Sequence, residues 1–158
     1  MTLQFAVASE VHQFFIQERI PYVVLGGIAL QRWGEPRFTR DVAVTILINP
    51  GEEEITLKKI LSAFSPRIPD AMEFALKNRI CLVRNKEGCE IDVSLGIPGY
   101  EEEVMNRAVE YELNEGCVVR ICSAEDLIIH KTLAGRPQDL FDIESIIMRQ
   151  GNKLDVAY

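Results

Sequence analysis

The stretch "VVLGGIALQRWGEPRFTRDVAVTILI", from Val23 to Ile48, decides the fold of this chain. A short apolar run ends at a Gly26-Gly27 pair, and a second apolar run begins with Asp41, fourteen residues after Gly27. The β-branched residues of both runs favour strands, and the glycine pair marks a turn between them. The stretch therefore predicts a strand, a short helix and a second strand, over 22–26, 28–33 and 41–48.

Outside this stretch, apolar periodicity predicts helices towards both ends of the chain and two β-hairpins between them. Ser123 begins a helix with the capping pattern S-x-x-D, and Pro137 suits the first turn of the next helix. The predicted elements are helices over 3–19, 51–64 and 71–77, a hairpin over 79–96, a short helix or turn over 99–107, a hairpin over 109–122, and two C-terminal helices, the last of which ends near Gln150.

This order of elements is typical of an α/β (α+β) domain, in which helices flank a mixed central β-sheet, here with two further C-terminal helices. The length fits a single domain over 1–158. No apolar run reaches the roughly 18–20 residues of a membrane span, and the N-terminus lacks the pattern of a signal peptide. The sequence therefore predicts a cytoplasmic protein with reduced thiols and no membrane partner.

The formal net charge of −7 is unevenly spread along the chain. Residues 1–84 carry ten Lys and Arg against nine Asp and Glu, whereas residues 85–158 carry seven against fifteen. This acidic total argues against broad, non-specific nucleic-acid binding, but it leaves room for a local phosphate site. The four cysteines form no C-x-x-C pair and lie far from both histidines in sequence, which argues against a zinc site.

The glycine pair and two acidic strands together suggest a metal-assisted nucleotide site. A helix that starts after glycines presents free backbone N–H groups to an anion. Side chains two apart on a strand point the same way, so Asp41 and Ala43 share one face, as do Glu90 and Asp92. If the two strands are neighbours, Asp41 and Asp92 converge, and the pair could hold Mg²⁺ against a triphosphate.

Each of these features also has a purely structural explanation. A glycine pair before a helix is a common turn. Asp41 could pair with Arg37 or Arg40 where its strand begins, and Glu90 with Asp92 could form a solvated strand edge. The combination of features, rather than any one of them, favours a nucleotide site.

The combination resembles the DNA-polymerase-β-like nucleotidyltransferase superfamily. Its signature is Gly-Gly or Gly-Ser at the end of a strand, a short helix, D-h-D or D-h-E on the next strand, and a third Asp on a later strand. Here these are the pair that begins at Gly26, "DVA" from Asp41, and Asp92 in "EIDV". The motifs are most similar to those of minimal enzymes related to the AbiEii-type toxins of toxin–antitoxin pairs. This chain has "GGIALQRWGEPRFTRDV" and "DLIIHKTLAGRPQDLFDI", and the resemblance covers residues 20–147.

The resemblance implies a nucleoside triphosphate (NTP) as substrate and Mg²⁺ or Mn²⁺ as cofactor. The implied nucleotide-binding residues are Gly26, Gly27, Arg40 and Lys131, and the implied catalytic metal ligands are Asp41 and Asp92, of which Asp92 also acts as general base. The reaction transfers a nucleoside monophosphate to a hydroxyl of an RNA such as tRNA, of a protein or of a small molecule. Because the chain is short for such an enzyme, a partner protein or a homodimer is expected to complete the site.

Ala43 departs from the family pattern, which has a second carboxylate at this position. Loss of one of three ligands is expected to weaken one metal ion and to slow phosphoryl transfer by orders of magnitude. Glu90 is a candidate replacement, but strand geometry places it about 7 Å from Asp92 along the strand. An aspartate replaced experimentally would leave the same sequence.

Three hypotheses follow from this departure: an active nucleotidyltransferase with an altered metal site, a nucleotide-binding protein without turnover, or a protein whose fold serves a protein–protein interface. The C-terminal charges also have an alternative explanation as an ordinary ion-pair network of Lys131, Arg136, Asp139 and Asp142.

Overall fold

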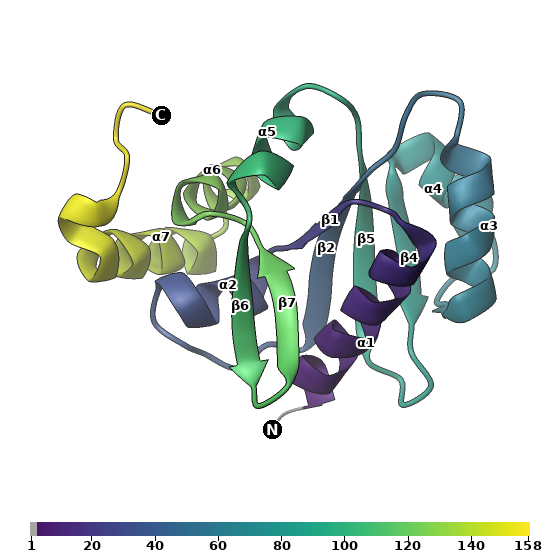
Figure 1. The fold of residues 1–158 in the computed structure, drawn as a ribbon, viewed down its shortest axis with the longest axis horizontal. Helices are drawn as coiled ribbons and strands as arrows, with labels where there is room; N and C mark the ends of the chain where they lie inside the picture. The colour runs from purple at the N-terminus through teal and green to yellow at the C-terminus, as the bar shows by residue number, and fades with distance from the viewer. Residues whose placement is uncertain (1–2) are drawn as a thin grey trace.

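The computed structural model describes residues 3–158, in which seven strands form one mixed sheet covered by helices (Figure 1). The strand order is β3-β4-β5-β2-β1-β7-β6. β2 and β5 are parallel neighbours, as are β1 and β7, and the other adjacent pairs are antiparallel. The strands are β1 (Tyr22–Val24), β2 (Asp41–Leu47), β3 (Ser65–Pro66), β4 (Ile80–Arg84), β5 (Glu90–Gly96), β6 (Val109–Asn114) and β7 (Cys117–Ile121). The predicted fold class, a mixed central sheet flanked by helices, is confirmed.

The three strands that carry the predicted site lie at the centre of the sheet. β2 pairs with β1 on one side and with β5 on the other, so the two acidic strands are neighbours, the condition on which the predicted site depends. Val42 and Val44 of β2, and Ile91 and Val93 of β5, are buried in the core. Because strand side chains alternate between faces, the residues between them point to the opposite face, where the acidic side chains lie.

Helices cover the sheet in three groups (Figure 1). α1 lies across β2 and β7, α4 packs on β4 with α3 against α4, and α6 and α7 pack against each other and against α2, while α5 contacts β1. The helices are α1 (Leu3–Glu18), α2 (Gly26–Trp33), α3 (Glu53–Ala63), α4 (Ala71–Asn78), α5 (Tyr100–Arg107), α6 (Ala124–Ala134) and α7 (Pro137–Gln150). This packing brings the C-terminal helices against the helix that follows β1. In residues 3–158, no helix has the length and apolar character needed to cross a membrane.

Two boundaries differ from the prediction in ways that matter for the site. β1 ends at Val24 and α2 begins at Gly26, so the glycine pair opens the helix and does not close the strand. The predicted strand end was wrong because the apolar Leu25 prolongs the run, whereas a φ of 61° at Gly26 already turns the chain. The short strand β3 was not predicted, since a two-residue segment has no periodicity and forms only by pairing with β4.

Capping explains where the two C-terminal helices begin and turn. Ser123 Oγ accepts a hydrogen bond from the Asp126 backbone N–H at 3.1 Å, which starts α6 as predicted. Gly135 takes the left-handed conformation, with φ of 63°, and ends α6. Pro137 then occupies the first turn of α7, also as predicted. The tight turn between the helices places Lys131 against α7.

Candidate functional site

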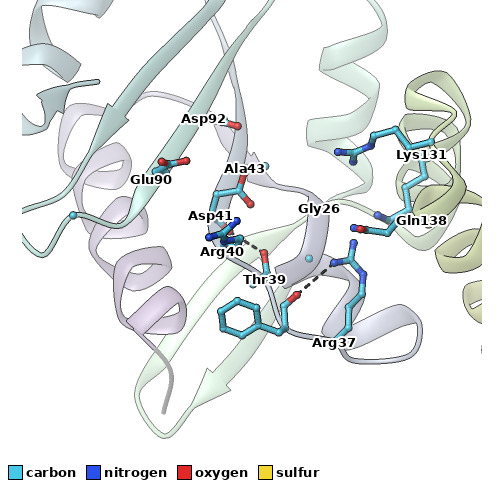
Figure 2. Close-up of a pocket in the computed structure, with 14 residues that line it drawn as sticks. Gly26, Arg37, Thr39, Arg40, Asp41, Ala43, Glu90, Asp92, Lys131 and Gln138 are labelled. Atoms are coloured by element: carbon cyan, nitrogen blue, oxygen red, sulfur yellow. Dashed lines mark hydrogen bonds between the residues drawn. The ribbon is translucent and has the colours of Figure 1, made fainter. Parts of the chain in front are cut away.

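A cavity of about 730 Å³ opens where α2, β2 and β5 meet the C-terminal helices (Figure 2). Every residue that the sequence predicted for the nucleotide and metal site lines this cavity: Gly26, Gly27, Arg40, Asp41, Asp92 and Lys131. The fold therefore brings together residues from four segments that lie far apart in the sequence. The roles of these residues stay predictions, whereas their shared location is a property of the structure.

The glycine pair forms one wall of the cavity and is held tightly in place. The Leu25 backbone N–H donates to the Ala43 carbonyl at 2.8 Å, which ties the turn to β2. A Cβ added at Gly27 would lie only 2.6 Å from the Cβ of Thr39, so a larger residue does not fit there without displacement. Among the described residues no side chain caps α2. The N–H groups of its first turn therefore remain available to an anion in the cavity.

Asp41 and Asp92 reach the cavity from neighbouring parallel strands (Figure 2). The register pairs Asp41 with Glu90 and Ala43 with Asp92, so the two aspartates lie diagonally across the strand pair. Burial, followed by the negative charges of Asp92 and Glu90, raises the pKa of Asp41 above its usual value. A divalent cation would relieve this repulsion.

Glu90 lies closer to the predicted site than its spacing from Asp92 suggested. Its strand position is level with Asp41, and it lines the same cavity. The sequence could give the separation of Glu90 and Asp92 along one strand, but not the register of that strand against β2. Glu90 is largely exposed, with 61% of its side-chain surface accessible, so its carboxylate is the most solvated of the three.

Arg67, which the sequence analysis missed, compensates part of this acidic charge. Its guanidinium lies 2.6 Å from Asp92 Oδ1 and 3.2 Å from Glu90 Oε1. Arg67 follows the unpredicted strand β3, and its backbone N–H donates to the Leu82 carbonyl of β4 at 3.0 Å. Its position therefore depends on strand pairing, and no local motif could have identified it.

On the other side of the cavity, Lys131 belongs to an ion-pair network. Its Nζ lies 2.9 Å from Asp142 Oδ2 and 3.6 Å from Asp139 Oδ1, and the residue is only 5% exposed. Arg37 also binds Asp142, through hydrogen bonds of 3.1 and 2.8 Å, and so it does not pair with Asp41. The network that the sequence offered as an alternative is therefore present. Lys131 also lines the cavity, so the network does not exclude a contact with a nucleotide, and that contact stays a prediction.

The carboxylates of this network are held in their charged form. Hydrogen bonds from Arg136 keep the pKa of Asp139 below its usual value. Burial opposes the charged form of Asp142, but hydrogen bonds from Arg37 and Lys131 outweigh it and lower the pKa of Asp142. Lys131 is therefore compensated within the protein before any anion arrives.

Arg40, labelled in Figure 2, and Phe38 are exposed residues that line the cavity. Phe38 is 75% exposed, and sequence reasoning gave it no role. Of the four cationic side chains that line the cavity, Arg40 alone makes no ion pair within residues 3–158. Thr39 supports this loop by donating from Oγ1 to the Asp41 carbonyl at 3.1 Å. Arg40 is consequently the cation most available to a phosphate.

The carboxylates that line the cavity are few and come in no dense cluster of metal ligands. Residues 3–158 contain no group of three or more His, Cys, Asp or Glu side chains placed to hold a metal ion. Ala43, level with Asp92, supplies no ligand. Mg²⁺ is commonly bound by one or two carboxylates and takes its other ligands from water and substrate phosphates. Asp41 and Asp92 are therefore candidate ligands for such an ion, and their metal-binding role stays a prediction.

Comparison with solved structures shows that this fold is the fold of nucleotidyltransferases. An antigenic nucleotidyltransferase-like protein from Paracoccidioides brasiliensis is 23% identical with a TM-score of 0.55, over 92% of this chain and 75% of that one. The antibiotic-resistance factor ANT(2'')-Ia, in complex with adenylyl-2''-tobramycin, is 18% identical with a TM-score of 0.65, over 96% and 92%. The lincosamide antibiotic adenylyltransferase LnuA, with lincomycin bound, is 11% identical with a TM-score of 0.57, over 92% and 96%.

No protein-family model and no curated protein matches the sequence. Identities as low as these establish a common fold, not a common activity. The chain therefore has the nucleotidyltransferase fold, and the particular similarity to AbiEii-type enzymes stays a prediction.

Replacing Asp41 with asparagine is expected to raise the free energy of unfolding at pH 7 by on the order of 1 kcal/mol, the size typical of a substitution that removes an unfavourable charge from a functional site. The pKa of Asp41 is raised in the folded state, so the folded state binds this proton more tightly than the unfolded state does. Ionisation of Asp41 therefore costs stability as the pH rises above the usual Asp pKa of about 3.9.

Urea denaturation at pH 7 and at pH 3 tests this expectation. The gain of Asp41→Asn should be present at pH 7 and absent at pH 3, where wild-type Asp41 is protonated in both states. Glu115→Gln, at an exposed position on the β6–β7 turn, serves as the control for loss of one negative charge. An equal gain in both variants would contradict a local origin.

Proposed function

We propose that this chain binds a nucleoside triphosphate in the cavity and transfers its nucleoside monophosphate to a hydroxyl of a small-molecule acceptor. The observation that carries the proposal is the convergence of the α2 N-terminus with Asp41 and Asp92 on one cavity. A helix N-terminus favours phosphate, and two carboxylates favour the metal ion that accompanies a triphosphate. The nucleotidyltransferase fold supports the same conclusion.

In this proposal the phosphates lie against the first turn of α2 at Gly26 and Gly27, with Arg40 in the cavity lining as an unpaired cation. Asp41 and Asp92 would hold Mg²⁺ or Mn²⁺, which supplies positive charge against the triphosphate. Lys131 would contact the nucleotide only by exchanging part of its interaction with Asp142, which makes it a weaker candidate than Arg40.

The bonds made and broken follow from the substrate. The acceptor hydroxyl oxygen attacks the α-phosphorus, and the bond from that phosphorus to the bridging oxygen breaks, so that pyrophosphate leaves with the electron pair. In this step Asp92, whose Oδ1 is held by Arg67, would accept the hydroxyl proton. Phosphoryl transfer depends mainly on positioning of the reactants and on compensation of their charge. In this proposal the site supplies both, although with one carboxylate fewer than the family pattern.

A small molecule is the acceptor class that we favour among RNA, protein and small molecule. Two proteins with the same fold were solved with adenylyl-2''-tobramycin and with lincomycin. The acidic net charge of −7 disfavours a polyanionic acceptor such as tRNA. A cavity of about 730 Å³ has the size range of small-molecule sites.

Nucleotide binding is expected to survive even if turnover is slow, because the phosphate-binding groups are intact and only the metal site lacks a carboxylate. Calorimetry with ATP, GTP, CTP and UTP in the presence of Mg²⁺ measures this directly. Arg40→Ala should weaken binding at least ~10-fold, as expected for a lost charge-assisted contact, whereas Arg84→Ala, an exposed change outside the cavity lining, should not. Absence of binding for all four nucleotides would reject the proposal.

Ala43→Asp is expected to raise the rate of nucleotidyl transfer at least ~10-fold, which is only ~1.4 kcal/mol of transition-state stabilisation. Position 43 lines the cavity and pairs in register with Asp92, so the new carboxylate would complete the acidic set of the family. Pyrophosphate release with aminoglycoside, lincosamide and total tRNA acceptors gives the rate. Ala43→Asn, of similar size but uncharged, is the matched control.

Equal rates for wild type and Ala43→Asp would show that position 43 is not a missing ligand. Glu90, level with Asp41, would then be the first alternative carboxylate to replace. If neither form turned over any acceptor, nucleotide calorimetry on both forms would separate a nucleotide-binding protein from one without a nucleotide site.

A protein–protein interaction is the second candidate function, and an exposed apolar surface on the C-terminal helices favours it. Large side chains there are 50–79% exposed: Leu133, Leu140, Phe141, Ile147 and Met148. Four of them form two adjacent pairs about two turns apart on α7, and such a stripe can pack against its own copy about a two-fold axis. Light scattering on a sizing column should show a dimer for wild type and a monomer for Phe141→Glu; a monomeric wild type would contradict self-association.

A further inference from the structure

One arginine side chain, outside the cavity lining, contacts two of the carboxylates that line the cavity. Arg67 does not line the cavity, yet its guanidinium lies 2.6 Å from Asp92 Oδ1 and 3.2 Å from Glu90 Oε1. The Arg67 side chain is only 13% exposed. The contact with Asp92 is therefore a largely buried, charge-assisted bond, which is stronger and better defined than an ion pair on the surface.

Strand pairing places Arg67 at the level of Asp92, because the two residues belong to one row of paired residues that runs across β4 and β5. The Arg67 backbone N–H bonds to Leu82 of β4, Leu82 pairs with Asp92 of β5, and Asp92 pairs with Ala43 of β2. Strands lie about 4.8 Å apart, so the Arg67 backbone is about two strand spacings from Asp92. The long arginine side chain crosses β4 to reach the carboxylate, and the row then continues to the position that lacks an acid.

The charges around Asp92 balance differently from those of the family pattern. Asp41, Glu90 and Asp92 contribute three carboxylates, and Arg67 contributes one permanent positive charge. The remaining two negative charges match one divalent cation. In addition, Arg67 engages Asp92 Oδ1, so only the second oxygen of Asp92 is available to a metal ion or to an acceptor hydroxyl.

We propose that Arg67 is a positioning residue that acts as a built-in cation in place of a second metal ion, so that this site holds a single divalent cation. The inference rests on the proposed function for its role in catalysis. Its central claim concerns charge and ligands alone and can be tested without any nucleotide.

The first experiment measures Mn²⁺ bound by the full chain without nucleotide, by electron paramagnetic resonance. Arg67→Met keeps the side-chain length and removes the charge, and it should bind Mn²⁺ at least ~10-fold more tightly than wild type, since a positive charge next to the cation is lost. The added Asp92→Asn change should abolish this gain. Arg67→Lys, which keeps the charge, should stay within a few-fold of wild type.

Arg84→Met is the matched control for this titration. Arg84 lies on β4, level with Glu90, but it is exposed and forms no ion pair within the described part of the chain. It should change Mn²⁺ affinity by less than Arg67→Met. Equal effects of the two variants, or no tightening in Arg67→Met, would overturn the proposal.

The second experiment counts Mn²⁺ in the complex with a non-hydrolysable NTP analogue. Wild type should hold one Mn²⁺ per protein, without the spin coupling of two adjacent ions. Ala43→Asp combined with Arg67→Met should hold two. Two coupled ions in wild type would overturn the proposal, and this measurement decides even if Arg67→Met does not fold, which thermal unfolding would reveal.

The two proposals fail in different ways. A chain that binds no nucleotide contradicts the proposed function, and the nucleotide-free Mn²⁺ titration still decides the role of Arg67. A chain that binds nucleotide together with two metal ions retains the proposed function and rejects the built-in cation. In an active enzyme, Arg67→Lys should lower kcat more than it changes KM for the NTP, because Arg67 acts through Asp92 and not on the phosphates.

Discussion

The parallel pairing of β2 with β5 is the constraint on which the whole site depends. It sets Asp41 level with Glu90 and Ala43 level with Asp92, and it directs these side chains to the face opposite the buried valines and isoleucines. A slip of one residue in either strand would carry the acids into the core, which burial of charge forbids. The hydrophobic alternation of the two strands therefore also determines the position of the acidic pair.

Charge is compensated on the two sides of the cavity by different means. On the acidic side, Arg67 forms an ion pair with Asp92, while burial and then the negative charge of Asp92 raise the pKa of Asp41. On the basic side, Lys131 is enclosed by two ionised aspartates. Arg40 is left as the unpaired cation of the cavity lining. Most buried charged groups are thus paired within the protein. Asp41 and Arg40 make no ion pair in the described part of the chain and remain available to a ligand.

Local sequence patterns predicted the elements well because each one is encoded by neighbouring residues. The alternation in "DVAVTILI", the cap at Ser123 and the Gly135–Pro137 turn all act within a few positions, and the structure has them where expected. The residues that meet at the cavity were predictable as a group because their motifs lie on those elements. Arg67 was not, since its role depends on β3 pairing with β4 and on the register of β4 with β5. Whether Lys131 is ion-paired or free was equally undecided from the sequence, because the spacing of Lys131, Asp139 and Asp142 on two helices is compatible with either.

Ala43 and Arg67 are best understood as two parts of one electrostatic arrangement. They are the two ends of the row through Leu82 and Asp92, and each reduces the negative charge around Asp92, one by lacking a carboxylate and the other by adding a guanidinium. A second carboxylate at position 43 beside an unpaired Asp92 would require metal to be tolerated, since close like charges destabilise a folded chain. With alanine and arginine in place, fewer uncompensated negative charges surround Asp92 when no metal ion is bound. The same arrangement lowers the charge available to attract a second ion, so the single-cation site that we propose and the charge balance of the metal-free protein would have a common physical origin.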